Sequence, residues 1–143
     1  YTNMEFGELL KQFLIDLQSL FRTSTKKLNI TFSQITLISS IPTDGIDMST
    51  LSHRIGVDNS TLTRLIDILI RNNFVQKSKN PNDGRSFIIS LTNNGEKLQF
   101  RIEEEIDRFG FKLYNKIPLE DQDEVKEVLS SLHWLISKHR LNS

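Results

Sequence analysis

Two stretches of this sequence, residues 59–67 and 77–86, carry side chains whose chemistry suits contact with a nucleic acid. Arginine can donate two hydrogen bonds to a guanine edge, serine and threonine can donate or accept, and lysine neutralises phosphates. The first stretch offers Asn59, Ser60, Thr61, Thr63 and Arg64, and the second offers Lys77, Lys79 and Arg85. The alternative for the first stretch is the polar, solvent-exposed face that any surface helix has.

The spacing of residues 48–67 predicts a helix-turn-helix that would present the first stretch. Such a motif needs a small residue in its first helix, a glycine in its turn and spaced apolar residues in both helices. Ser52 is small enough for the helices to cross closely, and Gly56 can adopt the left-handed conformation of the turn. Asp47 and Asp58 can cap the two helices. The apolar positions are Leu51, Ile55, Val57, Leu62, Leu65, Ile66 and Leu69.

A β-hairpin is predicted directly after these helices, because the apolar pattern changes from helical to alternating at Phe74. Residues 80–84 supply the Asn, Pro, Asp and Gly of a turn, and residues 87–91 read as the returning strand. We expect Arg85, beside the turn, to reach into a DNA minor groove, where the negative potential of A·T-rich tracts attracts arginine. Lys77 and Lys79 are expected to meet phosphates.

Further helices are predicted on both sides of this central part. Thr2 and Glu5 form a capping-box pattern that begins a helix, with Tyr1 and Phe6 spaced as its hydrophobic staple, and Thr31 and Gln34 repeat the box for a helix through Ser40. Thr92 can cap a long helix to about Asn115, and acidic residues between 120 and 124 suit the first turn of a last helix.

The first and last predicted helices carry apolar stripes that are too broad for one small core. We therefore expect these helices to be buried against a second copy of the chain. The residues expected at this dimer interface are Phe6, Leu9, Leu10, Phe13, Leu129, Leu132, Leu135 and Ile136.

The segment Asp83-Gly84-Arg85-Ser86, followed by Leu91-Thr92-Asn93-Asn94-Gly95, resembles the wing signature of the MarR family of bacterial and archaeal regulators. Residues 62–67 also resemble the recognition helix of that family. The resemblance implies that Arg85 enters the minor groove and that Asp83 orients it through a charge-assisted hydrogen bond, with Ser86 in the same DNA-contacting wing. One departure is Asn73, where the family usually has glycine; asparagine is the next most tolerant residue of a left-handed conformation.

The resemblance implies a fold that is mostly α-helical with a small β-hairpin wing (α+β), namely a winged helix-turn-helix with N- and C-terminal dimerisation helices. Residues 1–28 and 93–143 would form the dimerisation region, and residues 29–92 the DNA-binding module. The implied function is that of a sequence-specific regulator that binds double-stranded DNA as a homodimer on an inverted repeat. It would act as a repressor, with a small-molecule effector bound between the two regions.

The alternative function is a winged-helix protein–protein interaction module that has lost DNA binding. The formal net charge supports this alternative, because 18 basic residues are balanced by 18 acidic ones and the sum is zero. Indiscriminate nucleic-acid binders usually carry an excess of positive charge. Arg64 and Arg85 count against it, since both stand where a DNA-binding winged helix needs a cation.

The composition argues against an enzyme, a metalloprotein and a membrane protein. The 143 residues include no cysteine, which removes disulfides, thiolate nucleophiles and thiolate metal ligands. His53, His133 and His139 lack the spacing of a metal-binding pair, and no apolar run approaches the ~20 residues of a membrane-spanning helix. We expect a cytoplasmic protein without catalytic residues, cofactor or metal. Because the sequence begins at Tyr1, we also expect that a few native residues precede it.

Overall fold

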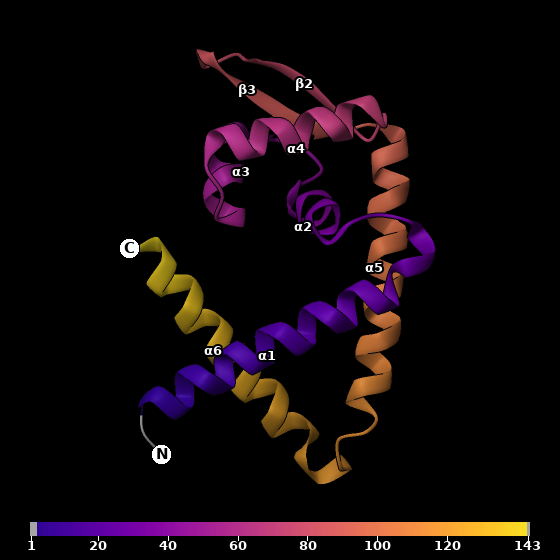
Figure 1. Ribbon diagram of the computed structural model, residues 1–143, viewed down its shortest axis with the longest axis vertical. Helices are drawn as coiled ribbons and strands as arrows, with labels where there is room; N and C mark the ends of the chain where they lie inside the picture. Colours follow the sequence, from indigo (N-terminus) through magenta and orange to yellow (C-terminus); the bar gives the residue numbers. More distant parts are fainter. Residues whose placement is uncertain (1–2, 143) are drawn as a thin grey trace. The chain divides into compact units, whose positions relative to one another are not determined.

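A computed structural model describes residues 3–142, which form helices and one small antiparallel sheet, so the predicted fold class is confirmed (Figure 1). Tyr1 and Thr2, the expected partners of Phe6 and Glu5 at the first helix start, lie outside the described residues. The elements are α1 (Asn3–Ser24), η1 (Lys26–Leu28), α2 (Phe32–Ser40), β1 (Ile46–Asp47), α3 (Met48–Ile55), α4 (Asn59–Arg71), β2 (Val75–Asn80), β3 (Asp83–Leu91), α5 (Asn93–Tyr114), η2 (Leu119–Asp121) and α6 (Gln122–Leu141).

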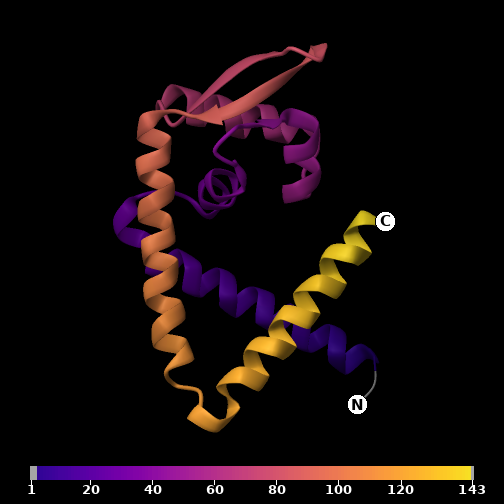
Figure 2. The same cartoon turned by 180° about the vertical axis from the view of Figure 1, so that it is seen from behind.

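The chain forms two compact units, residues 1–106 and residues 107–143, and the boundary between them falls within α5. The first unit contains the core, in which α2, α3, α4 and the start of α5 pack with the sheet. Within this unit α4 lies along the hairpin, and a tight turn joins it to α3, as both views show (Figures 1 and 2). The most deeply buried apolar side chains are Leu37, Ile38, Ile41, Leu51, Leu62, Ile66, Leu69, Ile89 and Ile102.

The predicted helix starts of the central module are confirmed by hydrogen bonds. Thr31 Oγ1 accepts from the Gln34 amide at 3.1 Å, and the Gln34 side chain accepts from the Thr31 amide at 3.0 Å, so the capping box is complete. Asp47 accepts from the amide of Thr50 at 2.8 Å and thereby caps α3. Gly56 ends α3 with a φ of 73°, the left-handed conformation that the predicted turn requires.

The sheet has three strands in the order β1-β3-β2, all antiparallel. The predicted turn over residues 80–84 is too long, because only Pro81 and Asn82 lie between the strands and β3 already begins at Asp83. The two-residue strand β1 was not predicted. It pairs Ile46 with Ile89, and a strand this short has no alternating pattern that a sequence could display.

Asn73 adopts a φ of 62°, so the expected left-handed conformation after α4 is confirmed. The hydroxyl of Thr92 donates to the Asn73 carbonyl at 2.6 Å and accepts from the amide of Gly95 at 3.0 Å. Thr92 therefore caps α5, as predicted, and also ties its start to the end of α4. Gly95 is required for this approach, because a Cβ there would lie 1.9 Å from the carbonyl oxygen of Phe74.

The second unit contains the end of α5, η2 and α6. Gln122 fixes the turn between the helices, since its Nε2 donates to the carbonyls of Tyr114 and Ile117 at 3.4 and 3.3 Å. The acidic cluster is only partly at the start of α6, because Glu120 and Asp121 lie in η2 and the helix begins at Gln122. No residue in the described part of α6 is buried.

Candidate nucleic-acid interface

Helix α4 separates its apolar and polar side chains as predicted. Leu62, Ile66 and Leu69 are fully buried in the core, whereas the opposite side of the helix faces solvent. Of the five residues expected to contact DNA, Thr61 is half-buried and the exposed ones are Asn59, Ser60, Thr63 and Arg64. The structure therefore presents this set together at the N-terminal end of one helix.

Asp58 organises the polar side chains at the start of α4. One of its carboxylate oxygens accepts from the Thr61 amide at 2.7 Å and from the Ser60 hydroxyl at 3.0 Å. Hydrogen bonds from the amide and hydroxyl of Thr61, together with the one from Ser60 and the nearby charge of Arg64, hold the pKa of Asp58 below its usual range. The carboxylate is thus ionised at neutral pH and occupies a donor that the helix N-terminus would otherwise offer to a phosphate.

Arg64 also contacts the polar side chains at the start of α4. Its Nη2 donates to the Thr61 hydroxyl oxygen at 3.4 Å, one turn back along the helix. This contact directs the guanidinium toward the N-terminal end of α4. A fork of donors held at that end suits a contact with the O6 and N7 acceptors of guanine.

The β2–β3 hairpin carries the three predicted cations of the wing, Lys77, Lys79 and Arg85, all exposed. The ammonium of Lys77 lies 4.2 Å from the ring centroid of Phe87 on the neighbouring strand. Such a cation–π contact restricts a flexible side chain, and the ammonium keeps its positive charge. Sequence reasoning missed Phe87 as a member of this surface, because it was expected only as part of the strand pattern.

Hydrogen bonds between polar groups fix the conformation of the hairpin tip. Asn80 donates from Nδ2 to the Ser86 hydroxyl at 3.1 Å, and its Oδ1 accepts from the amide of Asn82 at 3.0 Å. Ser86 is half-buried and also donates to the Asp83 carbonyl at 3.5 Å. Ser86 therefore has a bonding role inside the tip in addition to its predicted place at the interface.

The predicted bond between Asp83 and Arg85 has a different donor from the one expected. The Asp83 carboxylate accepts from the backbone N–H of Arg85 at 3.1 Å, not from its guanidinium. The cause is local, since a residue two positions along from an aspartate places its amide within reach of that side chain. Asp83 thus shapes the backbone that carries Arg85, and the guanidinium itself extends from an exposed residue.

The residues expected at a dimer interface lie on α1 and α6 and are largely exposed. On α1 they are joined by Leu14 and Ile15, which are also exposed, and on α6 by Val128, which is 61% exposed. The exposed members of the predicted set are Phe6, Leu9, Leu10, Phe13, Leu129, Leu135 and Ile136, while Leu132 is half-buried. Each helix therefore has an apolar surface that its own unit does not cover.

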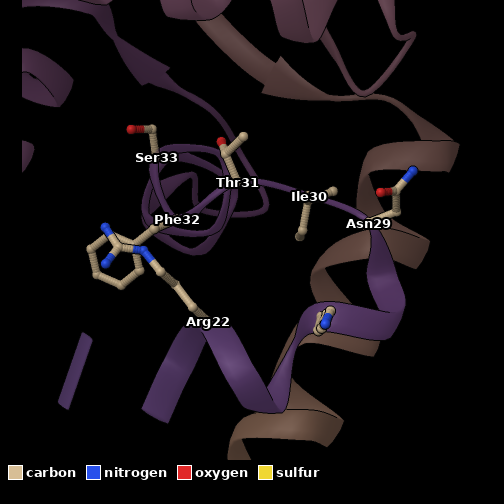
Figure 3. Close-up of a pocket in the computed structure, with 7 residues that line it drawn as sticks. Arg22, Asn29, Ile30, Thr31, Phe32 and Ser33 are labelled. Atoms are coloured by element: carbon tan, nitrogen blue, oxygen red, sulfur yellow. The ribbon is translucent and has the colours of Figure 1, made fainter. Parts of the chain in front are cut away.

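A hollow of about 500 Å³ lies within the first unit, where the end of α1 and η1 meet the start of α2 (Figure 3). Arg22 reaches across it, with its guanidinium carbon 5.1 Å from the ring centroid of Phe32. Lys26 adds a second cation to its wall. The remaining lining residues are Asn29, Ile30, Thr31 and Ser33. Sequence reasoning did not single out this hollow, because its walls come from three separate elements.

Within residues 3–142, no cluster of three or more His, Asp or Glu side chains could hold a metal ion. The described helices are also each too short or too polar to cross a membrane.

Known proteins resemble this chain in sequence and in fold. Residues 30–87 match the model of the MarR family. The HTH-type transcriptional regulator SarZ of Staphylococcus aureus (strain MRSA252) is 24% identical over 119 residues, covering 82% of this chain and 77% of SarZ.

The structural likenesses extend over nearly the whole chain. A MarR transcriptional regulator from Methanosarcina mazei Go1 has a TM-score of 0.81 at 20% identity, covering 95% of this chain and 99% of that one. Wild-type apo MarR from E. coli has a TM-score of 0.78 at 23% identity, covering 88% and 94%. A mutant MarR from E. coli complexed with operator DNA has a TM-score of 0.75 at 22% identity, covering 90% and 93%.

Proposed function

We propose that this chain, which matches the model of the MarR family over residues 30–87, is a transcription regulator of that family that binds duplex DNA sequence-specifically. The observation that carries the proposal is the joint exposure, within one compact unit, of the polar end of α4 and the three cations of the hairpin. The family match and the predicted fold both agree with it. The solved complex of a MarR with operator DNA adds support, since that protein shares this fold.

In this proposal α4 enters the major groove with Arg64 reading base edges, and the wing follows the backbone to the minor groove. Lys77 and Lys79 neutralise phosphates, and Arg85 enters the narrow groove, where potential and shape rather than hydrogen-bond pattern determine the contact. The net charge of zero does not oppose this arrangement, because association is guided by the local distribution of charge.

The regulator acts as a homodimer on an inverted repeat. The support is the row of exposed apolar side chains along α1 and the second row along α6, since monomeric proteins seldom expose large apolar patches. A twofold dimer would place two α4 helices in successive major grooves, about 34 Å apart. We assign residues 1–28 and 93–143 to dimerisation and residues 29–92 to DNA binding. The regulator acts in the cytoplasm, where the operator is accessible.

A small ligand bound in the hollow between α1 and α2 relieves repression. The hollow lies between a helix assigned to dimerisation and the first helix of the winged module, so an occupant would contact both regions. Arg22 and Lys26 in its wall favour a ligand that carries negative charge. Repression itself follows from occlusion, because a dimer seated on an operator blocks other proteins from that DNA.

The test is a selection of bound sequences from random duplex DNA, using the purified chain at roughly physiological salt. We expect enrichment of an inverted repeat whose half-sites are about 10 base pairs apart from centre to centre. The matched control is the double variant Arg64→Ala/Arg85→Ala, which should lose the enrichment while it remains folded. Absence of enrichment with the unmodified chain would contradict DNA recognition and favour the protein–protein interaction module.

A further inference from the structure

Two hydroxyl groups on the exposed face of α4 already donate hydrogen bonds to acceptors within the protein. Ser60 Oγ lies 3.0 Å from a carboxylate oxygen of Asp58, and Thr63 Oγ1 lies 2.8 Å from the backbone carbonyl oxygen of Asn59. Neither acceptor carries a proton, so the hydroxyl must be the donor in each bond. Each hydroxyl therefore presents only oxygen lone pairs toward whatever approaches from solvent.

We propose that Asp58 is a specificity-determining residue, which restricts Ser60 to accepting hydrogen bonds and thereby directs it to base amino groups. In the major groove these donors are N4 of cytosine and N6 of adenine, whereas guanine and thymine present acceptors at the corresponding positions. The inference rests on the proposed function, in which this end of α4 enters the major groove. Asp58 itself touches no base; it acts through Ser60.

The same carboxylate disfavours a phosphate at the start of α4. The Thr61 amide, one of the donors that a helix N-terminus offers to anions, is taken by Asp58 at 2.7 Å. The negative charge of Asp58 also repels a phosphate that approaches the remaining donors. Lys77 and Lys79 of the hairpin thus contact the phosphates, and the N-terminal end of α4 contacts the bases.

Arg64 completes the arrangement as the donor of this surface. Its Nη2 donates to the Thr61 hydroxyl oxygen at 3.4 Å, and other N–H groups of the guanidinium can reach a guanine. The surface therefore presents a hydrogen-bond acceptor at Ser60 and a fork of donors at Arg64. It favours a half-site in which a guanine lies near a base that carries an exocyclic amino group.

Two variants test the proposal by base preference and salt dependence. Ser60→Ala should reduce the preference for adenine or cytosine by roughly three- to tenfold at one symmetric pair of operator positions, with no change in salt slope. Asp58→Asn keeps an N-cap acceptor but removes the charge. It should raise affinity for random-sequence DNA by roughly threefold to tenfold at low salt and steepen the salt dependence. It should retain the base preference, because the Oδ1 of asparagine still accepts from Ser60.

Asp67→Asn is the matched control, because Asp67 is exposed on the same helix and lies seven residues beyond Ser60. It should leave the base preference unaltered and change random-sequence affinity less than Asp58→Asn does. The proposal is overturned if the unmodified chain selects an operator and Ser60→Ala retains its full base preference. It is also overturned if Asp58→Asn binds random DNA no better than Asp67→Asn. If the unmodified chain selects no sequence, the proposed function fails and this inference fails with it.

Discussion

The side-chain amide of Gln99 donates a hydrogen bond of 2.8 Å to the carbonyl oxygen of Ile38, across 61 positions of sequence. The same Nε2 donates to the carbonyl of Ile41 at 3.0 Å. Both carbonyls lie at the C-terminal end of α2, where a helix leaves its last acceptors without intrahelical donors. Gln99 thus caps α2 from α5 and joins two elements of the first unit.

Gln99→Ala should lower the free energy of unfolding by about 1–3 kcal/mol, because two part-buried carbonyl groups would each lose a donor. Gln12→Ala is the control: Gln12 is exposed on α1 and its Nε2 bonds only across the surface to Glu8, at 3.2 Å. The control should change stability by less than about 0.5 kcal/mol. Urea denaturation measures both. Equal effects for the two variants would mean that the Gln99 bonds contribute little.

The left-handed Asn73 gives a second prediction. Asn73→Ala should destabilise the fold by about 1–2 kcal/mol, since a Cβ without a compensating polar group is disfavoured at a φ of 62°. Asn73→Gly should be neutral or stabilising at the same position. Asn72 supplies the comparison, because it precedes Asn73 directly and has a φ of −83°. Thermal melts should show Asn72→Ala close to the unmodified chain, and an equally large loss there would exclude backbone strain as the cause.

Local features of this fold could be predicted from the sequence because their determinants lie within a few residues. The capping box at Thr31, the caps at Asp47 and Asp58, and the left-handed Gly56 and Asn73 each depend on spacing along one segment. The same reasoning placed the polar face of α4 correctly, since burial of Leu62, Ile66 and Leu69 determines which side faces solvent.

Features that depend on distant partners could not be predicted in this way. Glu105 stands in an acidic run that suggests an exposed surface, yet only 8% of it is exposed and it pairs with Lys27 at 2.6 Å. Strand β1 exists only because Ile89 lies beside Ile46. At the candidate site, the bond from Ser60 to Asp58 depends on side-chain rotamers, which residue type and spacing leave undetermined.

Acid should destabilise the protein partly through Asp47. Hydrogen bonds from the amide and hydroxyl of Thr50 hold the pKa of Asp47 below the usual aspartate value, which is about 3.9. A pKa that is lower in the folded state gives stability that is present above the unfolded value and is lost as pH falls through the folded one. Asp47→Asn retains a cap but cannot titrate, so its stability should fall less steeply below about pH 4. Identical pH profiles would exclude this contribution.

The dimer proposal predicts that assembly depends on the apolar face of α6. Leu132→Asp should give monomer or aggregate, because the interface would bury an unpaired charge. Ser130→Asp introduces the same charge at an exposed position away from Leu129 and Leu132 on the helix, and should leave the dimer intact. Sedimentation at roughly tens of micromolar measures the mass, well above the Kd of a stable dimer. A monomeric unmodified chain under these conditions would contradict the proposed assembly.

Removal of Arg64 and removal of Arg85 should impair DNA binding in different ways. Arg64→Ala should cost about 1–3 kcal/mol per half-site and relax preference at one symmetric pair of positions, because Arg64 is proposed to read base edges. Arg85→Ala should instead weaken binding to many sequences together, flatten the salt dependence and reduce the advantage of A·T-rich flanks. The measurement is affinity against an operator library at two or more salt concentrations.

Asp83 provides the control for the wing. Its carboxylate accepts from the Arg85 backbone amide at 3.1 Å, so Asp83→Asn should keep the hairpin tip and bind nearly as the unmodified chain does. Asp83→Ala removes that acceptor and should show a milder form of the Arg85→Ala defect, since the guanidinium remains but its backbone is less fixed. If Arg85→Ala leaves both affinity and salt slope intact, the wing does not contact DNA. Recognition would then depend on α4 alone, and the hairpin cations would need another explanation.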